Sequence, residues 1–397
     1  MDLQRNSAYR GKTFAFGTLM AAGLVMLCCL SLSAGPYSEK YAREHAAVIP
    51  VASTFASFTE SFEGAGGALT QAIDANMPYE PTPAQIDQLP ATTGITAFSM
   101  NPDTRNNPTL SATEENAIAD AIDYFDQRGI SCSCMVVDLT TGHVIGSNYD
   151  ARVYGASAFK GVVAAYVCEQ MIDGGVYELG GSLQNLIESS VRWSDNDSYR
   201  TLKSAYASGL ASWVRDMGVD PTYVSRYRFP TYSAQESTAL WAHIASYLDS
   251  ESETAVWLGE QLRATSVSQI RDAVEIGLAD GSLLDAGLLG ASGFTDAGSA
   301  GAGFADADSA DAGLADVDSA GAAGNVPEEQ SILERHGAVV QNKAGWISGE
   351  YNSTSDAGLV HLDGHVYAIS IMTSAPDSAS SRAAVTQLAL ELLRAIR

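Results

Sequence analysis

Positive charge is what this 397-residue chain has least of. It carries 22 lysine and arginine residues against 47 aspartate and glutamate residues, which gives a formal net charge of −25 at pH 7. A surface with this balance repels nucleic-acid phosphates and anionic lipids, so neither is an expected partner. Only five of the cations are lysines, and two of these five lie in the motifs described below.

Cysteine and histidine are also few, and neither forms a metal-binding pattern. The six histidines are scattered and there is no Cys-x-x-Cys, so no metal or other cofactor is expected. Of the five cysteines, Cys28 and Cys29 belong to an apolar segment. Cys132 and Cys134 share one face of a predicted strand and cannot easily pair with each other. Either one of them pairs with Cys168, or all three are small buried apolar residues.

One stretch is long and apolar enough to cross a membrane. Three basic residues within the first twelve precede an apolar run over 14–34. A short basic segment followed by about 20 apolar residues is typical of an export signal or a membrane anchor. We expect residues 1–34 to be a cleaved signal or a retained anchor, and either alternative places the rest of the chain outside the cytoplasm.

Two segments have little capacity to form a core. From 35 to 107 the hydrophobic periodicity is weak and prolines cluster between 78 and 90, which predicts a stalk or linker with at most a short helix over 55–76. From 279 to 325 the chain repeats Asp-Ala-Gly and holds eight aspartates but no lysine, arginine or glutamate. This composition predicts a disordered Ala/Asp/Gly/Ser-rich insertion.

The remaining residues, 108–278 and 326–397, show clear helix and strand patterns. Strands near both ends with helices between them predict an α+β domain, in which helices cover one antiparallel sheet. The expected elements are a helix over 111–127, strands over 132–139 and 143–146, helices from 158–172 to 278, strands over 337–343, 357–361 and 366–373 with a turn through Gly345, and a helix over 380–397.

Three short motifs occur in order along this domain: Ser157-Ala-Phe-Lys160, Ser194-Asp-Asn196 and Lys343-Ala-Gly345. Residues three apart on a helix lie on one face, so Lys160 can take the proton of Ser157, which is otherwise a poor nucleophile. Burial and a second lysine nearby both favour the neutral amine. The helix N-terminus after Ser157 also suits a developing oxyanion. The pattern therefore predicts an acyl-transfer site.

The second and third motifs supply the other groups of such a site. Ser194 can pass a proton to a leaving nitrogen, and the Asn196 amide can bind a substrate carbonyl. Lys343, on an edge strand, can orient a substrate carboxylate. Gly345 and Trp346 are expected at the substrate, with the Trp346 N–H as the second oxyanion donor.

These motifs make the chain similar to class A β-lactamases and the wider superfamily of penicillin-recognising serine hydrolases. The similarity covers 111–278 and 326–397, including the strand pair through 138–142 and the stretch 356–360. It implies a β-lactamase/transpeptidase-like fold, which is a three-layer α/β/α sandwich with a helical subdomain. It also implies a small-molecule β-lactam or a peptidoglycan stem peptide as the substrate. The implied roles are nucleophile for Ser157, base for Lys160, the second wall of the site for Ser194 and Asn196, and the third wall for Lys343.

Three departures limit what the resemblance implies. Ala344 replaces the hydroxyl residue of the family's third motif, so binding of a substrate carboxylate is expected to be weaker. The 37 residues from Ser157 to Ser194 are a shorter interval than is usual in class A enzymes. The glutamate that activates the deacylating water in those enzymes has no counterpart, because no glutamate lies between Glu188 and Glu236. Glu236 begins a predicted helix and is a poor substitute, so hydrolysis of an acyl-enzyme is expected to be slow.

Three functions fit this pattern. The favoured one is a β-lactamase-like serine hydrolase that acts on a β-lactam or a cell-wall amide. The second is a D-alanyl-D-alanine peptidase, that is, a penicillin-binding protein. The third is a non-catalytic peptidoglycan-binding module, which the paired Ser157 and Lys160 argue against, since a binder needs no basic lysine beside a serine. The sequence does not indicate an oligomeric state.

Overall fold

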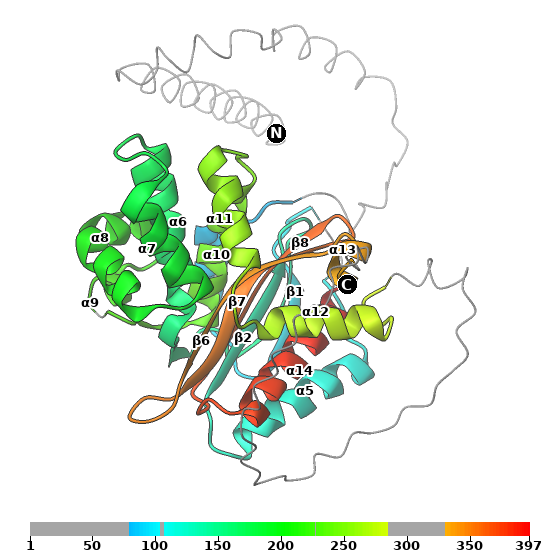
Figure 1. The fold of residues 1–397 in the computed structure, drawn as a ribbon. Helices are drawn as coiled ribbons and strands as arrows, with labels where there is room; N and C mark the ends of the chain where they lie inside the picture. Colours follow the sequence, from blue (N-terminus) through cyan, green and yellow to red (C-terminus); the bar gives the residue numbers. More distant parts are fainter. Residues whose placement is uncertain (1–78, 104–106, 227, 285–329) are drawn as a thin grey trace, which may run out of the picture. The chain divides into compact units, whose positions relative to one another are not determined.

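The computed structural model describes residues 79–103, 107–226, 228–284 and 330–397. All of them belong to one compact unit (Figure 1). The predicted signal or anchor, most of the predicted stalk and most of the predicted insertion lie outside the described residues. Within the described part, no helix has the length and apolar character needed to span a membrane.

A six-stranded antiparallel sheet forms the centre of the unit, in the order β1-β3-β2-β8-β7-β6. Strand β8 pairs with β2, so the two ends of the domain meet in the middle of the sheet. This arrangement confirms the predicted α+β fold. The strands are β1 (Ile95–Ser99), β2 (Cys132–Asp138), β3 (His143–Ser147), β6 (Val339–Ile347), β7 (Ser353–Leu362) and β8 (His365–Thr373).

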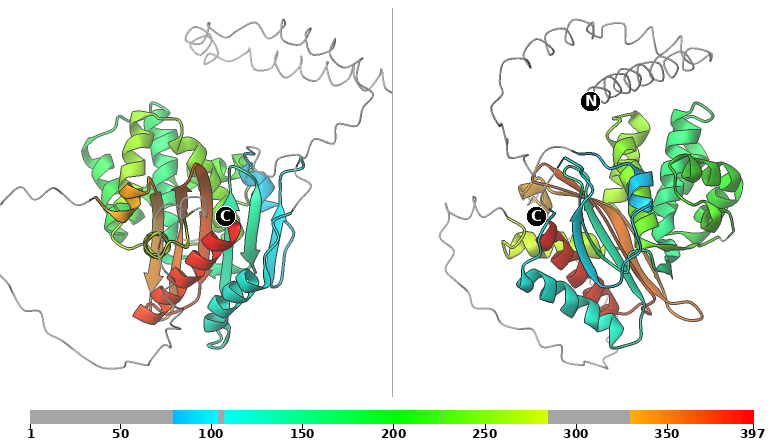
Figure 2. Two further views of the ribbon diagram at one scale, coloured as in Figure 1. Left: turned by 90° about the vertical axis from the view of Figure 1, so that its right-hand side faces the viewer. Right: turned by 180° about the vertical axis from the view of Figure 1, so that it is seen from behind.

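Helices cover both faces of the sheet, and each face has its own apolar core. Along β2, Met135 and Val137 belong to one core while Cys134 and Val136 belong to the other, as the alternation of side chains on a strand requires. Figure 2 shows the closing helix and α5 on one face and the helical subdomain on the other. The helices on the first face are α5 (Ala112–Asp126), α12 (Gln269–Ala279) and α14 (Ala379–Ile396).

The helical subdomain on the other face carries the first two motifs. Its first helical element is a 3-10 turn, followed by an α-helix that continues into a π-helix, a form often found at functional sites. The subdomain also contains a separate pair of short antiparallel strands. Its elements are β4 (Arg152–Tyr154), η1 (Ala156–Phe159), α6 (Lys160–Tyr166), η2 (Val167–Asp173), α7 (Gly181–Arg192), α8 (Asn196–Asp216), α9 (Thr222–Arg226), β5 (Thr231–Ser233), α10 (Ala234–Leu248) and α11 (Glu253–Arg263).

The predicted stalk is wrong for its C-terminal part. Residues from 79 onward join the domain, with a short helix α4 (Pro83–Asp87) and β1, which pairs with β3 at the edge of the sheet. Pro83 occupies the first turn of α4, directly after the capping residue Thr82. The N–H that proline lacks would have no partner within the helix at this position, so proline does not destabilise the helix. The prolines therefore start a helix here instead of preventing one.

Two smaller predictions also need correction. Gly345 is not a turn, because β6 runs straight through it to Ile347. The predicted insertion begins too early, since α12 extends to Ala279 and Leu283 is fully buried. A last short helix, α13 (Ile332–Arg335), leads into β6.

The three cysteines of the domain are free and buried. Cys132 and Cys134 belong to the core on one face of the sheet, and Cys168 belongs to the core on the other. The sheet lies between them, so the alternative in which one pairs with Cys168 is wrong and the buried-apolar alternative is confirmed.

Candidate active site

Ser157 lies in the 3-10 turn η1, half-buried, directly before the buried helix α6. The preceding Ala156 has a φ of 44°, a left-handed conformation that is strained for alanine. Strand β6 passes against this turn at Gly345. A Cβ atom there would lie 2.2 Å from the Gly155 carbonyl oxygen and 2.7 Å from the Ser157 nitrogen. Only glycine permits this approach, which brings the third motif to the predicted nucleophile.

Lys160 connects the first motif to the second. Its side chain is fully buried, and its Nζ donates to the Ser194 hydroxyl at 3.2 Å, the Asn196 side-chain oxygen at 2.8 Å and the Ser194 carbonyl at 2.5 Å. Burial lowers the pKa of Lys160 to about 8, against the opposing effect of the Asp195 carboxylate. With this pKa about a tenth of Lys160 is neutral at pH 7, far more than of an exposed lysine.

Among the described residues, the Ser157 hydroxyl has no hydrogen-bond partner. The predicted contact with Lys160 is not formed, because the lysine Nζ binds the second motif instead. The two residues are still adjacent on η1 and α6. In ligand-free structures, catalytic hydrogen bonds are often long or absent and form only with substrate.

The turn that presents Ser194 is held by the residue after it. Asp195 is the N-cap of α8 and accepts from the Ser198 N–H at 2.7 Å. Hydrogen bonds from Ser198 are the main cause of the lowered pKa of Asp195. Ser194 itself has a φ of 58°, which is unusual for a serine. The Asp195 carboxylate is thus occupied in capping α8.

Lys343 is also buried, and its ammonium does not reach the solvent. Only 1% of the residue is exposed, and Nζ donates to the Ala344 carbonyl at 2.6 Å and lies 5.1 Å from the centre of the Trp346 ring. Burial, and then the charge of Lys160, lower the pKa of Lys343 to about 7, while Asp356 opposes them. To contact a substrate carboxylate as predicted, this ammonium must first leave the Ala344 oxygen.

Two stacked aromatic rings, which were not predicted from the sequence, form a wall beside Lys160. The ring centres of Tyr199 and Phe229 lie 5.6 and 5.9 Å from the Lys160 Nζ, and the two rings are stacked at 4.9 Å. Tyr199 is on α8, whereas Phe229 belongs to the connection between α9 and β5. Together they contribute to the desolvation of the lysine. The sequence carries no signal that pairs these two distant residues.

A third buried lysine was also missed. Lys203 on α8 is 5% exposed, donates to the Val224 carbonyl at 2.6 Å and lies 5.4 Å from the centre of the Phe159 ring. All three lysines in the described part of the chain are thus buried, and none has a carboxylate within ion-pair distance. The low number of lysines in the sequence could have indicated this burial. Lysines that serve only to keep a protein soluble would be more numerous.

Glu236 does not take the place of the missing loop glutamate. Its carboxylate forms an ion pair with Arg152 and accepts from the Ser233 N–H at 2.8 Å, which closes the capping box of α10. These contacts engage the Glu236 carboxylate in the fold, in line with the prediction that Glu236 is a poor substitute for the missing glutamate. Within the described residues, no group of three or more histidine, cysteine, aspartate or glutamate side chains is arranged to hold a metal ion.

Comparison with known proteins gives one family match. Residues 315–396, about a fifth of the chain, match the model of the beta-lactamase enzyme family. The matched region contains Lys343, Gly345 and Trp346 but not Ser157 or Lys160. No curated protein matches the chain. The family match supports the resemblance to β-lactamase-like serine hydrolases.

Solved structures that resemble the chain include class A β-lactamases at low identity. The enzyme from Mycobacterium abscessus is 15% identical with a TM-score of 0.45, and the match covers 70% of this chain and 98% of that one. A β-lactamase from Burkholderia vietnamiensis is 16% identical with a TM-score of 0.47, over 71% and 96% of the two chains. A mutant of the reconstructed ancestral enzyme of Gram-negative bacteria, bound to 5(6)-nitrobenzotriazole, is 16% identical with a TM-score of 0.46, over 70% and 98%.

Proposed function

We propose that this protein is a serine hydrolase that is acylated on Ser157 by a β-lactam or a related cell-wall amide. The observation that carries the proposal is the environment of Lys160. It is a buried lysine with a lowered pKa, it is bonded to Ser194 and Asn196, and it lies three residues after a serine in a strained turn. A lysine that only supports the fold has no need of this combination. The match to the beta-lactamase enzyme family supports the same reaction class.

The proposed reaction uses the chain's own residues throughout. Neutral Lys160 turns its Nζ toward Ser157 and accepts the hydroxyl proton as the Ser157 oxygen attacks the substrate carbonyl carbon. The backbone N–H groups of Ser157 and Trp346 stabilise the negative oxygen that forms. When the C–N bond breaks, Lys160 returns the proton through the Ser194 hydroxyl to the leaving nitrogen. The products of this step are an ester on Ser157 and an amine, which stays attached to the acyl group when the substrate is a β-lactam.

The second half of the reaction is expected to be slow. Hydrolysis of the ester needs a base that activates water, and Glu236 is already engaged by Arg152 and Ser233. A long-lived acyl-enzyme is typical of a penicillin-binding protein, whereas a resistance enzyme hydrolyses its acyl-enzyme rapidly. We propose that the protein works outside the cytoplasm, exported or anchored by residues 14–34, where cell-wall amides are found.

Intact-mass spectrometry of the full chain incubated with a fluorescent penicillin tests this function, with Ser157→Ala as the control. A stable adduct on the wild type and none on the variant is the expected result. No adduct, with the penicillin left intact, would refute the proposed acylation by a β-lactam and favour a non-catalytic module. Consumption of the penicillin without an adduct would show fast deacylation, and the argument from the missing glutamate would be wrong.

A further inference from the structure

A groove with two tyrosine walls lies next to the strand that leads to Ser157. Its volume is about 660 Å³, within the range of about 300–1,000 Å³ that is usual for ligand pockets. Tyr154, which ends β4 three residues before Ser157, lines the groove, and so does Tyr351 from the turn between β6 and β7. Because β6 also carries Gly345 to the Ser157 turn, two elements connect the groove with the candidate active site.

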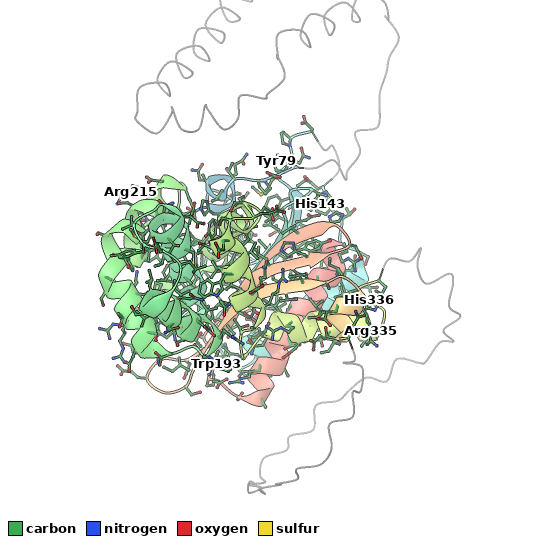
Figure 3. The ribbon with its side chains drawn as sticks, turned by 45° about the horizontal axis from the view of Figure 1, so that its top comes forward. Tyr79, His143, Trp193, Arg215, Arg335 and His336 are labelled. Carbon is green, nitrogen blue, oxygen red and sulfur yellow. The ribbon has the colours of Figure 1, made fainter. Side chains whose placement is uncertain are left out.

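The path from the active site to the groove runs along the surface of the molecule. All residues from Ile347 to Tyr351 are exposed. The six residues from Gly345 to Tyr351 span at most about 20 Å, since an extended chain advances about 3.3 Å per residue. The opposite side of the site is open as well, because Trp193 is 64% exposed where the helical subdomain meets the sheet (Figure 3). A substrate bound at Ser157 therefore has room to extend into the groove.

The two tyrosine rings give the groove a flat apolar surface. Their centres are 5.4 Å apart and their planes are inclined by 38°. Tyr351 is 58% exposed and Tyr154 is half-buried. Aromatic faces that are left in water beside a groove favour a ligand with a flat apolar surface of its own.

One cation and one anion line the same groove. The Arg128 guanidinium lies 4.0 Å from the centre of the Tyr124 ring and donates one N–H to the Tyr124 carbonyl at 2.9 Å, which fixes its position. Neither Arg128 nor Glu350 forms an ion pair with a residue that the structure describes. The remaining N–H groups of Arg128 and the carboxylate oxygens of Glu350 are thus left to bind a ligand.

Two uncharged side chains add further donors. The Asn352 side-chain oxygen accepts from the Gly349 N–H at 3.1 Å, so its amide N–H groups are left to donate. The Ser374 hydroxyl accepts from the Ser131 N–H at 2.9 Å and keeps its own proton for a ligand. With Arg128 and Glu350, the groove offers several donors and acceptors but no net charge.

This combination suits one class of ligand. A lipid chain would leave the polar groups unpaired, and a polyanion would need an excess of cations. A pyranose ring has a flat face of C–H groups and a rim of hydroxyl groups that both donate and accept.

We infer that the groove binds the glycan attached to a cell-wall amide, with a pyranose ring on Tyr351 and its hydroxyl groups bonded to Arg128 and Glu350. The inference rests on the proposed function, because the amide of the same substrate would be the one that acylates Ser157. It adds a saccharide subsite to that function and predicts that the natural substrate is larger than a β-lactam.

Calorimetry with triacetylchitotriose, an uncharged trimer of N-acetylglucosamine, tests the groove on the full-length chain. Saturable binding is expected, and Tyr351→Ala should weaken it about tenfold or more, as truncation of an aromatic anchor does. Arg128→Gln should also weaken it about tenfold, because hydrogen bonds from a charged group are lost. Tyr177→Ala, which removes a 48% exposed tyrosine between η2 and α7, should leave the affinity unchanged. No saturable binding, or an affinity that neither groove variant lowers, would overturn the inference.

A peptide is the competing occupant of the groove. Diacetyl-L-lysyl-D-alanyl-D-alanine, titrated in the same way, should bind wild type and Tyr351→Ala equally. If the peptide rather than the saccharide lost affinity in Tyr351→Ala, the groove would be a peptide subsite and the inference would be wrong.

Failure of the inference differs from failure of the proposed function. The free saccharide has no amide that Ser157 must attack, so Ser157→Ala should bind it as tightly as the wild type. A penicillin adduct on the wild type without saccharide binding would refute the groove alone. Saccharide binding without an adduct would refute acylation by a β-lactam and leave the groove in place.

Discussion

At the scale of single residues, burial sets the chemistry of the candidate site. An exposed lysine is protonated at neutral pH, and a protonated lysine accepts nothing. Lys160 and Lys343 are buried with no carboxylate within ion-pair distance, and burial lowers their pKa values to about 8 and about 7. Of the three groups that Nζ of Lys160 contacts, only the Ser194 hydroxyl can also donate. A neutral Lys160 therefore fits its surroundings when Ser194 turns its proton toward it.

The pH dependence of acylation follows from this assignment. Below pH 8 the rate constant for acylation should rise about tenfold per pH unit as Lys160 loses its proton, and it should level off above pH 8. Lys160→Arg keeps a long cationic side chain that cannot be deprotonated, so it should lower the rate by about 10²- to 10⁴-fold. Quenched mass spectrometry between pH 5.5 and 9.5 measures both effects. A flat profile, or an active arginine variant, would exclude Lys160 as the base.

At the scale of elements, α8 organises the site from two positions. Its N-terminus presents Asn196 to Lys160, and two turns later Lys203 holds the Val224 carbonyl of α9. The connection from α9 to β5 then places Phe229 on Tyr199, beside Lys160. Lys203 thus ties α9, and the connection that follows it, to the helix that carries the second motif.

Stability against pH tests the state of Lys203. Burial lowers its pKa from 10.5 to about 8, so between pH 8 and about pH 10 the unfolded chain holds a proton that the folded chain has lost. The free energy of unfolding contributed by this residue therefore rises with pH in that window. Lys203→Met should remove this gain, on the order of 1–2 kcal/mol, in urea unfolding curves at pH 7.5 and pH 10. If the free energy of unfolding changed equally between the two pH values in wild type and variant, Lys203 would keep its proton in the folded state.

Elements whose signal is local were predictable from the sequence, and those that depend on distant contacts were not. The helix predicted over 111–127 is α5, and Ser111 caps it by accepting a hydrogen bond from the Glu114 N–H. Strands β2 and β8 have the length and composition expected of buried strands. Strand β1 was missed because it is an edge strand in which every residue is only half-buried, so its pattern is weak. The three motifs were visible at the site, but the wall of Tyr199 and Phe229 exists only after folding.

At the scale of the whole molecule, the net charge of −25 acts on everything that approaches the site. A negative electrostatic field lowers the rate at which anions encounter the protein and leaves neutral molecules unaffected. Salt screens this field, because the Debye length falls from about 30 Å at 0.01 M salt to about 8 Å at 0.15 M. The buried ammonium groups of Lys160 and Lys343 act against this field only at short range.

Ionic strength should therefore affect acylation by benzylpenicillin, which carries a carboxylate, but not acylation by its uncharged methyl ester. The second-order rate constant for acylation by benzylpenicillin should increase about two- to fivefold from 0.01 to 0.15 M salt as repulsion is screened. The rate for the methyl ester should stay constant, which controls for effects of salt on the protein itself. Stopped-flow mixing at pH 8 gives both values. A rate for the free acid that falls with salt would mean that positive charge near Ser157 outweighs the molecule's acidic surface. In that case the site would attract carboxylates in spite of the molecule's net negative charge.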